Sequence, residues 1–402
     1  MAHKTKSSRP HTSRRETFNQ IVLMLIVAFA LRVFVVEAFV IPTGSMAPTL
    51  KGAHARFVCE NCGYRFDVNY SPDRPSATDI NIPRRWTTVN QKRVYCPNCN
   101  FAVPDQQSER PLVFYGDRIL VLKYSYLLRE PRRWDVVVFK TPASPEIHHY
   151  NQAYIKRLIG TPGEQVMIVD GDIYVATVDN PTDADWQIQR KPDVVQEALW
   201  RIVHDIDFAP RGLTPDNRIA YESYDIASYI PWRSDDRKWV YTRDNTGARA
   251  FNFSDLSGSG TLYFDRTVGR QKHSLTDFLA YDQIADQGRL NPVGDLKISF
   301  FYRRGGGEGP LELKLSKRDD LFIARIQAGS VSLYHAHVDD PENRTLLAQE
   351  PYSLPDRPVK VDFMNVDFQV RLLVDGEELL ATTSEQYAPD VASLKLEDAP
   401  PP

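Results

Sequence analysis

The decapeptide IPTGSMAPTL at residues 41–50 presents one serine, Ser45, on a short segment that directly follows an apolar run. Pro42 and Pro48 fix their own φ angles and disfavour a helix, so we expect the backbone around the serine to be extended. Gly44 permits another part of the chain to approach the backbone closely beside Ser45. The pattern can present a nucleophilic serine at the end of the apolar run, but by itself such a cluster of proline, glycine and serine is more often an ordinary turn.

A second run, YIKRLIGTPGE at residues 154–164, places Lys156 within an apolar, β-like segment. Burial on such a strand disfavours the charged form of an amine. A neutral amine can act as the general base for a serine hydroxyl. The alternative is a surface lysine that extends its amine into water from an edge strand. Ser45 and Lys156 are therefore a candidate pair of nucleophile and base.

The N-terminal forty residues predict a membrane anchor. Residues 1–17 form a basic tail, and residues 21–40 are apolar apart from Arg32 and Glu37. A helix over residues 18–40 is long enough to cross a hydrocarbon core of about 30 Å, and the basic tail places the N-terminus in the cytoplasm. The alternative is a cleaved signal peptide, but no small-x-small pattern follows the run. We expect a single-pass helix in the inner membrane, with the rest of the chain on the extracytoplasmic side.

The serine and lysine stretches resemble those of bacterial type I signal peptidases, which are membrane-bound serine–lysine proteases. Two further segments carry the resemblance in the family's order, GDRILVLK at residues 116–123 and RWDVVVFKTP at residues 133–142. The resemblance implies a mainly β fold, with an antiparallel β core split between residues 41–52 and 111–180. It also implies an endopeptidase that removes signal peptides from exported precursor proteins at the lipid bilayer.

The resemblance assigns roles to individual side chains. Ser45 matches the nucleophile and Lys156 the general base, with no cofactor needed for catalysis. The Ser45 backbone N–H and the Thr43 hydroxyl match the two donors of the oxyanion hole. The shallow pockets that admit small residues at the −3 and −1 positions of the substrate match Phe39, Ile41 and Ile155.

The family's last catalytic segment, a Gly-Asp-Asn run followed by Ser-x-Asp-Ser-Arg, has no match before Pro402. In the family this segment supplies a serine that bonds the base amine and an Asp/Arg pair that braces the site. We expect that the sequence is a fragment whose continuation carries it. An alternative function is an inactive, membrane-tethered binding scaffold. A third, a self-cleaving serine–lysine repressor relative, is not expected to carry an N-terminal membrane helix.

All four cysteines fall within residues 53–110, in the knuckles CENCG and CPNCN. Cys59, Cys62, Cys96 and Cys99 offer four thiolates, which suit a tetrahedral zinc ion as in a zinc ribbon. Because four protein ligands leave no open position, the zinc ion would be structural. The alternative is two disulfides, since the segment is expected in an oxidising compartment. We therefore interpret residues 53–110 as a zinc-ribbon-like insert.

Residues 258–395 contain short alternating runs separated by turn signals, which favour a β-sandwich. The runs resemble laminin-G and concanavalin-like sandwiches. The preceding residues 181–257 have no recognisable pattern, and we treat them as an unassigned connector. Two Asp-Gly pairs, at residues 170–171 and 375–376, each predict a tight hairpin turn. The net charge of −3 provides no basic field, so we expect no nucleic-acid partner.

Overall fold

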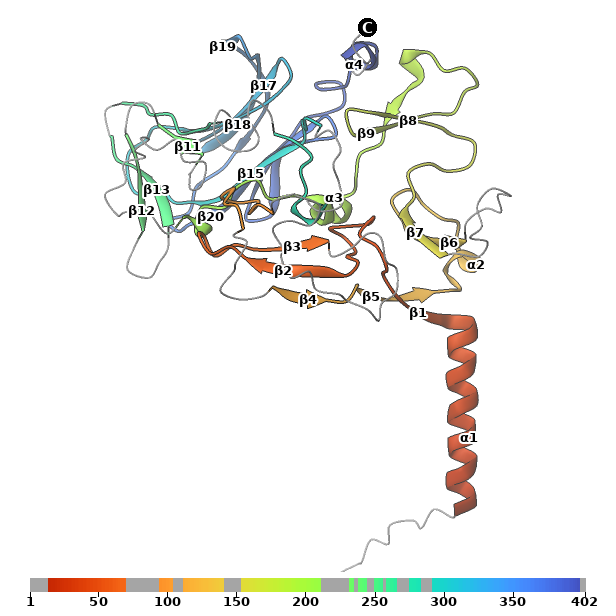
Figure 1. Cartoon of the computed structure of the whole chain (residues 1–402). Coiled ribbons are helices and arrows are strands. Elements are labelled where there is room, and N and C mark those ends of the chain that lie inside the picture. The colour runs from red at the N-terminus through yellow and green to blue at the C-terminus, as the bar shows by residue number, and fades with distance from the viewer. Residues whose placement is uncertain are drawn as a thin grey trace, which may run out of the picture.

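The computed structural model describes residues 14–69, 94–103, 111–140, 153–210, 231–234, 238–243, 249–255, 258–265, 275–282 and 291–397. Over these residues the chain is mainly β, as predicted, and one long helix projects from the folded body (Figure 1). Three short helices complete the described α structure, and they are α2 (Ser125–Leu128), α3 (Asp193–Leu199) and α4 (Val391–Glu397).

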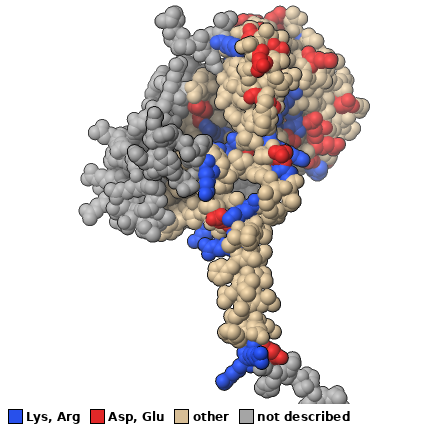
Figure 2. All heavy atoms as spheres, turned by 90° about the vertical axis from the view of Figure 1, so that its right-hand side faces the viewer, with Lys and Arg blue, Asp and Glu red and all other residues tan. Residues whose placement is uncertain are grey.

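The projecting helix is long and apolar enough to cross a membrane. Helix α1 (Arg14–Ala30) continues as a π-helical turn, η1 (Leu31–Val35), and none of their residues is buried. Figure 2 shows the uncharged surface of this helix between charged atoms at its outer end and at the body. The predicted end at residue 40 was wrong, because Val36–Val40 form strand β1. β-Branched valines favour strands, and β5 (Arg118–Leu122) offers β1 an antiparallel partner.

Three small antiparallel sheets carry or flank the segments that contain Ser45 and Lys156. They lie at the end of the body from which α1 leaves (Figure 1). One is the β1–β5 pair, the second has β2 between β3 and β4, and the third is the β6–β7 pair. The new strands are β2 (His54–Val58), β3 (Arg65–Asn69), β4 (Leu112–Phe114), β6 (Val136–Lys140) and β7 (Ala153–Arg157).

A further three-stranded sheet follows, in the order β10–β9–β8. Its hairpin turn is the predicted Asp170-Gly171 pair, with φ angles of 53° and 83°. The segment predicted as a connector then forms short elements, among them the β12–β13 pair and β11, whose partner β14 lies in the segment predicted as the start of the β-sandwich. The bounds are β8 (Gln165–Val169), β9 (Asp172–Ala176), η3 (Asp183–Asp185), β10 (Gln187–Ile188), η4 (Ile206–Phe208), β11 (Trp232–Arg233), β12 (Trp239–Arg243), β13 (Arg249–Phe253), β14 (Tyr263–Phe264) and η5 (Ala280–Asp282).

Two four-stranded antiparallel sheets form the C-terminal part, in the orders β15–β20–β21–β22 and β16–β17–β18–β19. Both contribute to one hydrophobic core, and their likeness to laminin-G or concanavalin-like sandwiches stays a prediction. The Asp375-Gly376 turn has the expected positive φ angles of 50° and 85°. The strands are β15 (Leu296–Tyr302), β16 (Leu311–Lys317), β17 (Asp320–Gln327), β18 (Ser330–His337), β19 (Asp340–Pro351), β20 (Val359–Val366), β21 (Gln369–Val374) and β22 (Glu377–Ala381).

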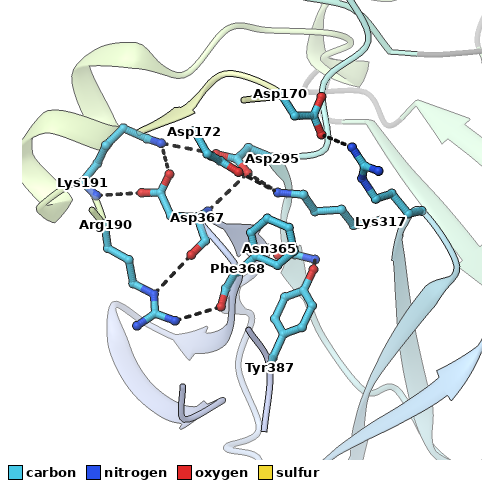
Figure 3. Close-up of polar contacts among 11 residues, drawn as sticks. Asp170, Asp172, Arg190, Lys191, Asp295, Lys317, Asn365, Asp367, Phe368 and Tyr387 are labelled. Carbon is cyan, nitrogen blue, oxygen red and sulfur yellow. Dashed lines mark hydrogen bonds and ion pairs between the residues drawn. The ribbon is translucent and has the colours of Figure 1, made fainter. Parts of the chain in front are cut away.

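The β8–β9 hairpin packs against these C-terminal sheets, since Val169 and Tyr174 belong to their hydrophobic core. A buried cluster of charges lies at the same junction (Figure 3). The amine of Lys317 lies 3.4 Å from the Asp172 carboxylate and 3.2 Å from that of Asp295. Lys191 pairs with Asp295 and with Asp367. The cluster therefore joins β9 to residues of the C-terminal part by charge as well as by apolar contact.

Candidate active site

The structure brings Ser45 and Lys156 together. Ser45 lies on the loop after β1, and Lys156 extends from β7 until its Nζ atom makes a hydrogen bond to Ser45 Oγ. The serine is exposed and the lysine is half-buried. An amine that contacts the hydroxyl in this way can accept the serine proton when the amine is neutral. The two residues predicted as nucleophile and base thus have the geometry that their roles need.

Asp117 fixes both ends of the loop that carries Ser45, residues 41–51, which we call the serine loop. Its backbone oxygen accepts the Ile41 N–H at 2.9 Å, and its carboxylate accepts the Lys51 N–H at 2.7 Å. The Asp117 N–H in turn donates to the Lys51 carbonyl at 2.8 Å. Gly116 is needed for this close approach, because a Cβ atom there would lie 1.8 Å from the Ile41 oxygen. The Gly-Asp pair of residues 116–117 therefore holds the ends of the serine loop together.

Within the loop the chain turns instead of running extended as predicted. The Ala47 N–H bonds the Gly44 oxygen at 2.8 Å, and the Leu50 N–H bonds the Met46 oxygen at 2.9 Å. Two prolines exclude a regular helix but are compatible with successive turns. The turns compact the loop, so Ser45 projects from a short curved segment with closed ends.

The remaining predicted site residues lie on the same elements. Thr43 is exposed two residues before Ser45, and Phe39 is half-buried on β1. Ile41 is only 3% exposed, so little of its side chain is open to a ligand in this structure. Ile155 is half-buried, and strand alternation places its side chain on the opposite face of β7 from that of Lys156. The roles of these residues in an oxyanion hole and in substrate pockets stay predictions.

Contacts of residues that follow Lys156 in the chain hold the end of β7 in place. The next residue, Arg157, donates to the Trp134 backbone oxygen at 2.9 Å, and burial lowers the pKa of its guanidinium. Arg133 pairs with Glu164 and also donates to the Ile159 oxygen. These bonds tie the residues before β6 to those after β7, so strand β7, which carries Lys156, has little freedom to shift.

The four cysteines meet at one buried point. The Cys59 and Cys99 Sγ atoms are 3.6 Å apart, and those of Cys62 and Cys96 are 3.7 Å apart. All four sulfurs lie within 4.8 Å of one another. A zinc ion with Zn–S bonds of about 2.3 Å requires sulfurs about 3.8 Å apart at the corners of its tetrahedron. The cysteines are free in this structure, and their arrangement is compatible with a structural metal ion.

Asparagines complete the surroundings of the cysteine cluster. Asn61 Nδ2 donates to Cys99 Sγ at 3.8 Å, and Asn98 Nδ2 donates to Cys62 Sγ at 3.9 Å, so each knuckle supplies a donor to the other. Donors of this kind orient metal ligands and offset the charge of thiolates. Gly63 and Asn100 have positive φ angles of 80° and 56°, as expected for the turns of the two knuckles.

Strand β2 of the β3–β2–β4 sheet lies between the end of the serine loop and the first two cysteines in the chain. Asp67 on β3 accepts hydrogen bonds from Lys51 at 2.6 Å and from Arg56 at 2.8 Å. Burial alone would raise the pKa of Asp67, but the bonds from Arg56 and Lys51 outweigh it, so that this pKa is lowered. The charged carboxylate thus anchors the end of the serine loop to β3.

One residue at the site has no signal in the sequence. Tyr281, in η5, is 2% exposed and lies directly against Gly44, the residue before the candidate nucleophile. No turn pattern or periodicity relates residue 281 to residue 44, and residue 281 lies outside the four segments that carry the family resemblance. Only the folded structure shows that these two parts of the chain meet.

Comparison with known families agrees with the geometry. The family model described as "Signal peptidase, peptidase S26" matches residues 14–84 and 99–207, just under half of the chain. Both Ser45 and Lys156 fall within the match, which leaves out only residues 85–98 between residue 14 and residue 207. It thus includes parts of the four-cysteine segment as well as β8, β9 and α3.

Curated relatives point to the same family. "Signal peptidase I" of Rickettsia bellii (strain OSU 85-389) is 27% identical over 175 residues, which make up 44% of this chain and 44% of that protein. "Signal peptidase I" of Rickettsia massiliae (strain Mtu5) is 29% identical over 171 residues, or 42% of this chain and 46% of that protein. "Probable signal peptidase I-2" of Synechocystis sp. is 37% identical over 73 residues, or 18% and 33%.

The chain spans less than half the length of these curated relatives. No solved structure matches it. The family match and the relatives together support a type I signal peptidase over the matched residues.

Proposed function

We propose that this protein is a membrane-anchored serine endopeptidase that removes signal peptides from exported precursors. The observation that carries the proposal is the contact between Lys156 Nζ and Ser45 Oγ, two atoms that come from residues 111 positions apart in sequence. The resemblance of both segments to signal peptidases, and the apolar helix that precedes β1 and the serine loop, support the same function.

The mechanism follows from the chemistry of the pair. Neutral Lys156 accepts the proton of Ser45 as Oγ attacks the scissile carbonyl, which forms a tetrahedral intermediate. The Ser45 backbone N–H and the Thr43 hydroxyl stabilise its oxyanion. Lys156 then gives the proton to the leaving amine, and an ester on Ser45 remains. A water molecule, deprotonated by the same amine, hydrolyses this ester and releases Ser45.

Lys156 must be neutral to begin this cycle, and its side chain is half-buried in this structure. A bound substrate and the adjacent bilayer would remove water from it and favour its neutral form. The precursor lies as an extended strand along the site, with small residues at −3 and −1 in shallow pockets lined by Phe39, by Ile155 and by the small part of Ile41 that is exposed. Because α1 leads directly into β1, the site acts at the extracytoplasmic membrane surface, with the N-terminus in the cytoplasm.

The four cysteines hold a structural zinc ion under this proposal. The sulfur distances fit a tetrahedral site, and the asparagine donors fit its surroundings. The four cysteines would hold the ion beside the turn between β2 and β3, and it would take no part in the peptidase chemistry, because they would leave it no open position.

The test is cleavage of a synthetic precursor with an Ala-x-Ala motif by the full chain in detergent. Wild type is expected to cut after the second alanine, while Ser45→Ala and Lys156→Ala do not. Lys140→Ala, on the exposed end of the neighbouring strand β6, is the matched control and is expected to cut at the wild-type rate. Equal cutting by wild type and Ser45→Ala would refute the proposed nucleophile. An inactive wild type would favour the tethered binding scaffold only if a chain that also carries the family's last catalytic segment stays inactive.

A further inference from the structure

Tyr281 lies outside both segments that match the family model. A Cβ atom built on Gly44 would lie 2.2 Å from Tyr281 Cε1 and 3.0 Å from its Cζ. No side chain larger than hydrogen fits between the loop backbone and this ring. The ring of Tyr281 therefore lies in direct contact with the most flexible position of the loop, one residue before Ser45.

Tyr281 is itself firmly held. Its ring lies 6.3 Å from that of His54, which stacks on Phe114 with ring centroids 5.5 Å apart. The preceding residue, Ala280, belongs to the same hydrophobic core as the four cysteines. His54 also bonds the Gly52 oxygen through Nδ1 at 2.8 Å, at the end of the serine loop. The tyrosine thus connects the loop to the β2–β3–β4 sheet and to the cysteine core.

The segment that presents Tyr281 is closed by bonds of its own. Asp277 and Asn291 exchange backbone and side-chain hydrogen bonds of 2.9–3.0 Å. The Val293 N–H donates to the Leu275 oxygen at 2.9 Å. Residues 275–282 therefore meet the loop as a fixed surface, although a long stretch of sequence separates the two.

We propose that Tyr281 is a positioning residue for the nucleophile, which holds the Gly44–Ser45 backbone so that Ser45 Oγ stays against Lys156 Nζ. The inference rests on the peptidase function proposed above. Asp117 fixes the loop at residues 41 and 51, whereas the glycine between them is free to change its φ angle. Packing of the ring against that glycine removes this freedom. A nucleophile displaced by about 1 Å can lose about 100-fold in rate.

The first test separates positioning from general stability. Tyr281→Ala is expected to lower kcat for the Ala-x-Ala precursor by about 10- to 100-fold with KM nearly unchanged, because only the reacting geometry is altered. Tyr281→Phe keeps the ring and is expected to retain kcat within about 2-fold. Tyr302→Ala, which removes a half-buried tyrosine from β15, is the control for the loss of an aromatic side chain and is expected to leave kcat unchanged.

The second test alters the contact between Gly44 and the Tyr281 ring. Gly44→Ala alone should lower kcat, because its methyl group collides with the Tyr281 ring. In the double variant Gly44→Ala/Tyr281→Ala the methyl group has room, so kcat should rise above that of Gly44→Ala. Equal kcat values for Tyr281→Ala and Tyr302→Ala, or no recovery in the double variant, would overturn the proposal.

A third readout does not depend on activity. Hydrogen exchange of the Ala47 and Leu50 amides, which bond within the loop, should accelerate in Tyr281→Ala while the amides of β20 and β21 stay unchanged. This result would support the positioning role even in a protein without cleavage activity, so the two proposals can fail separately. Unchanged loop exchange in Tyr281→Ala would refute the role of the tyrosine.

Discussion

Replacement of Asp172 by asparagine is predicted to stabilise the junction between β9 and the C-terminal sheets at neutral and higher pH. Asp172 is 2% exposed, and it shares the buried cluster with Asp295, Asp367 and two lysines (Figure 3). Three carboxylates against two ammonium groups leave one negative charge in excess. Burial, helped by the neighbouring carboxylates and opposed by Lys317, raises the pKa of Asp172 to about 7.

The size of the stabilisation expected for Asp172→Asn follows from the pKa of Asp172. An aspartate in an unfolded chain has a pKa of about 3.9, so the difference of about three units corresponds to about 4 kcal/mol. Between pH 4 and pH 7 the folded state binds the extra proton and the unfolded state does not. The stability supplied by this group is therefore present at low pH and is lost as the pH rises to about 7. Asparagine resembles the protonated carboxyl group and has no such dependence.

Hydrogen exchange of the β8–β9 hairpin can measure this effect, with variant and wild type compared at each pH. The advantage of Asp172→Asn in opening free energy should grow by about 4 kcal/mol from pH 4 to pH 8. Asp170→Asn is the matched control, since Asp170 lies in the adjoining turn at a φ angle that asparagine tolerates, and it should show no such change. A constant difference across the pH range, or a less stable Asp172→Asn at pH 8, would refute the charge argument.

Three more predictions concern the site and the cysteine centre. Thr43→Val should lower kcat by about 100- to 1,000-fold with little change in KM if the hydroxyl stabilises the oxyanion, and steady-state cleavage kinetics would show an unchanged kcat if it does not. Gly116→Ala should destabilise the serine loop by about 1–3 kcal/mol, because its methyl group meets the Ile41 oxygen; thermal unfolding and loop exchange test this, and wild-type values for both would contradict it. Cys59→Ser should lose bound zinc and the exchange protection of β2 and β3, since structural zinc supplies about 10–16 kcal/mol in small zinc domains; metal analysis that finds no zinc in wild type would contradict the assignment.

Parts of the fold that depend on short-range chemistry could be predicted from the sequence. The Asp170-Gly171 turn formed because aspartate and glycine tolerate the positive φ angles that a tight hairpin requires. The knuckle turns at Gly63 and Asn100 formed for the same reason. The pairing of Ser45 with Lys156 was predicted because each residue lies in a segment with a recognisable family pattern, and the structure places them in contact.

Other features depend on partners that the local sequence does not reveal. The composition of Val36–Val40 is compatible with the end of an apolar helix or with a strand. The pairing with β5 makes it a strand. Strand β19 has no strand pattern in its own sequence, because DPENRTLLAQEP is polar and begins and ends near proline, yet β18 supplies its hydrogen bonds. The contact of Tyr281 with Gly44 is fixed by tertiary packing alone. Long-range contacts of this kind require the folded structure.

The central claim is that Lys156 acts as the general base for Ser45, and Lys156→Arg tests it most directly. Arginine keeps the positive charge and can still donate to Ser45 Oγ, but its guanidinium does not lose a proton in proteins. The measurement is the cleavage rate of the Ala-x-Ala precursor by Lys156→Arg, by Lys140→Arg as the matched control, and by wild type. We predict that Lys156→Arg loses at least about 100-fold in kcat, as expected for the loss of a general base, while Lys140→Arg cuts at the wild-type rate. Cleavage by Lys156→Arg at the wild-type rate would contradict the mechanism.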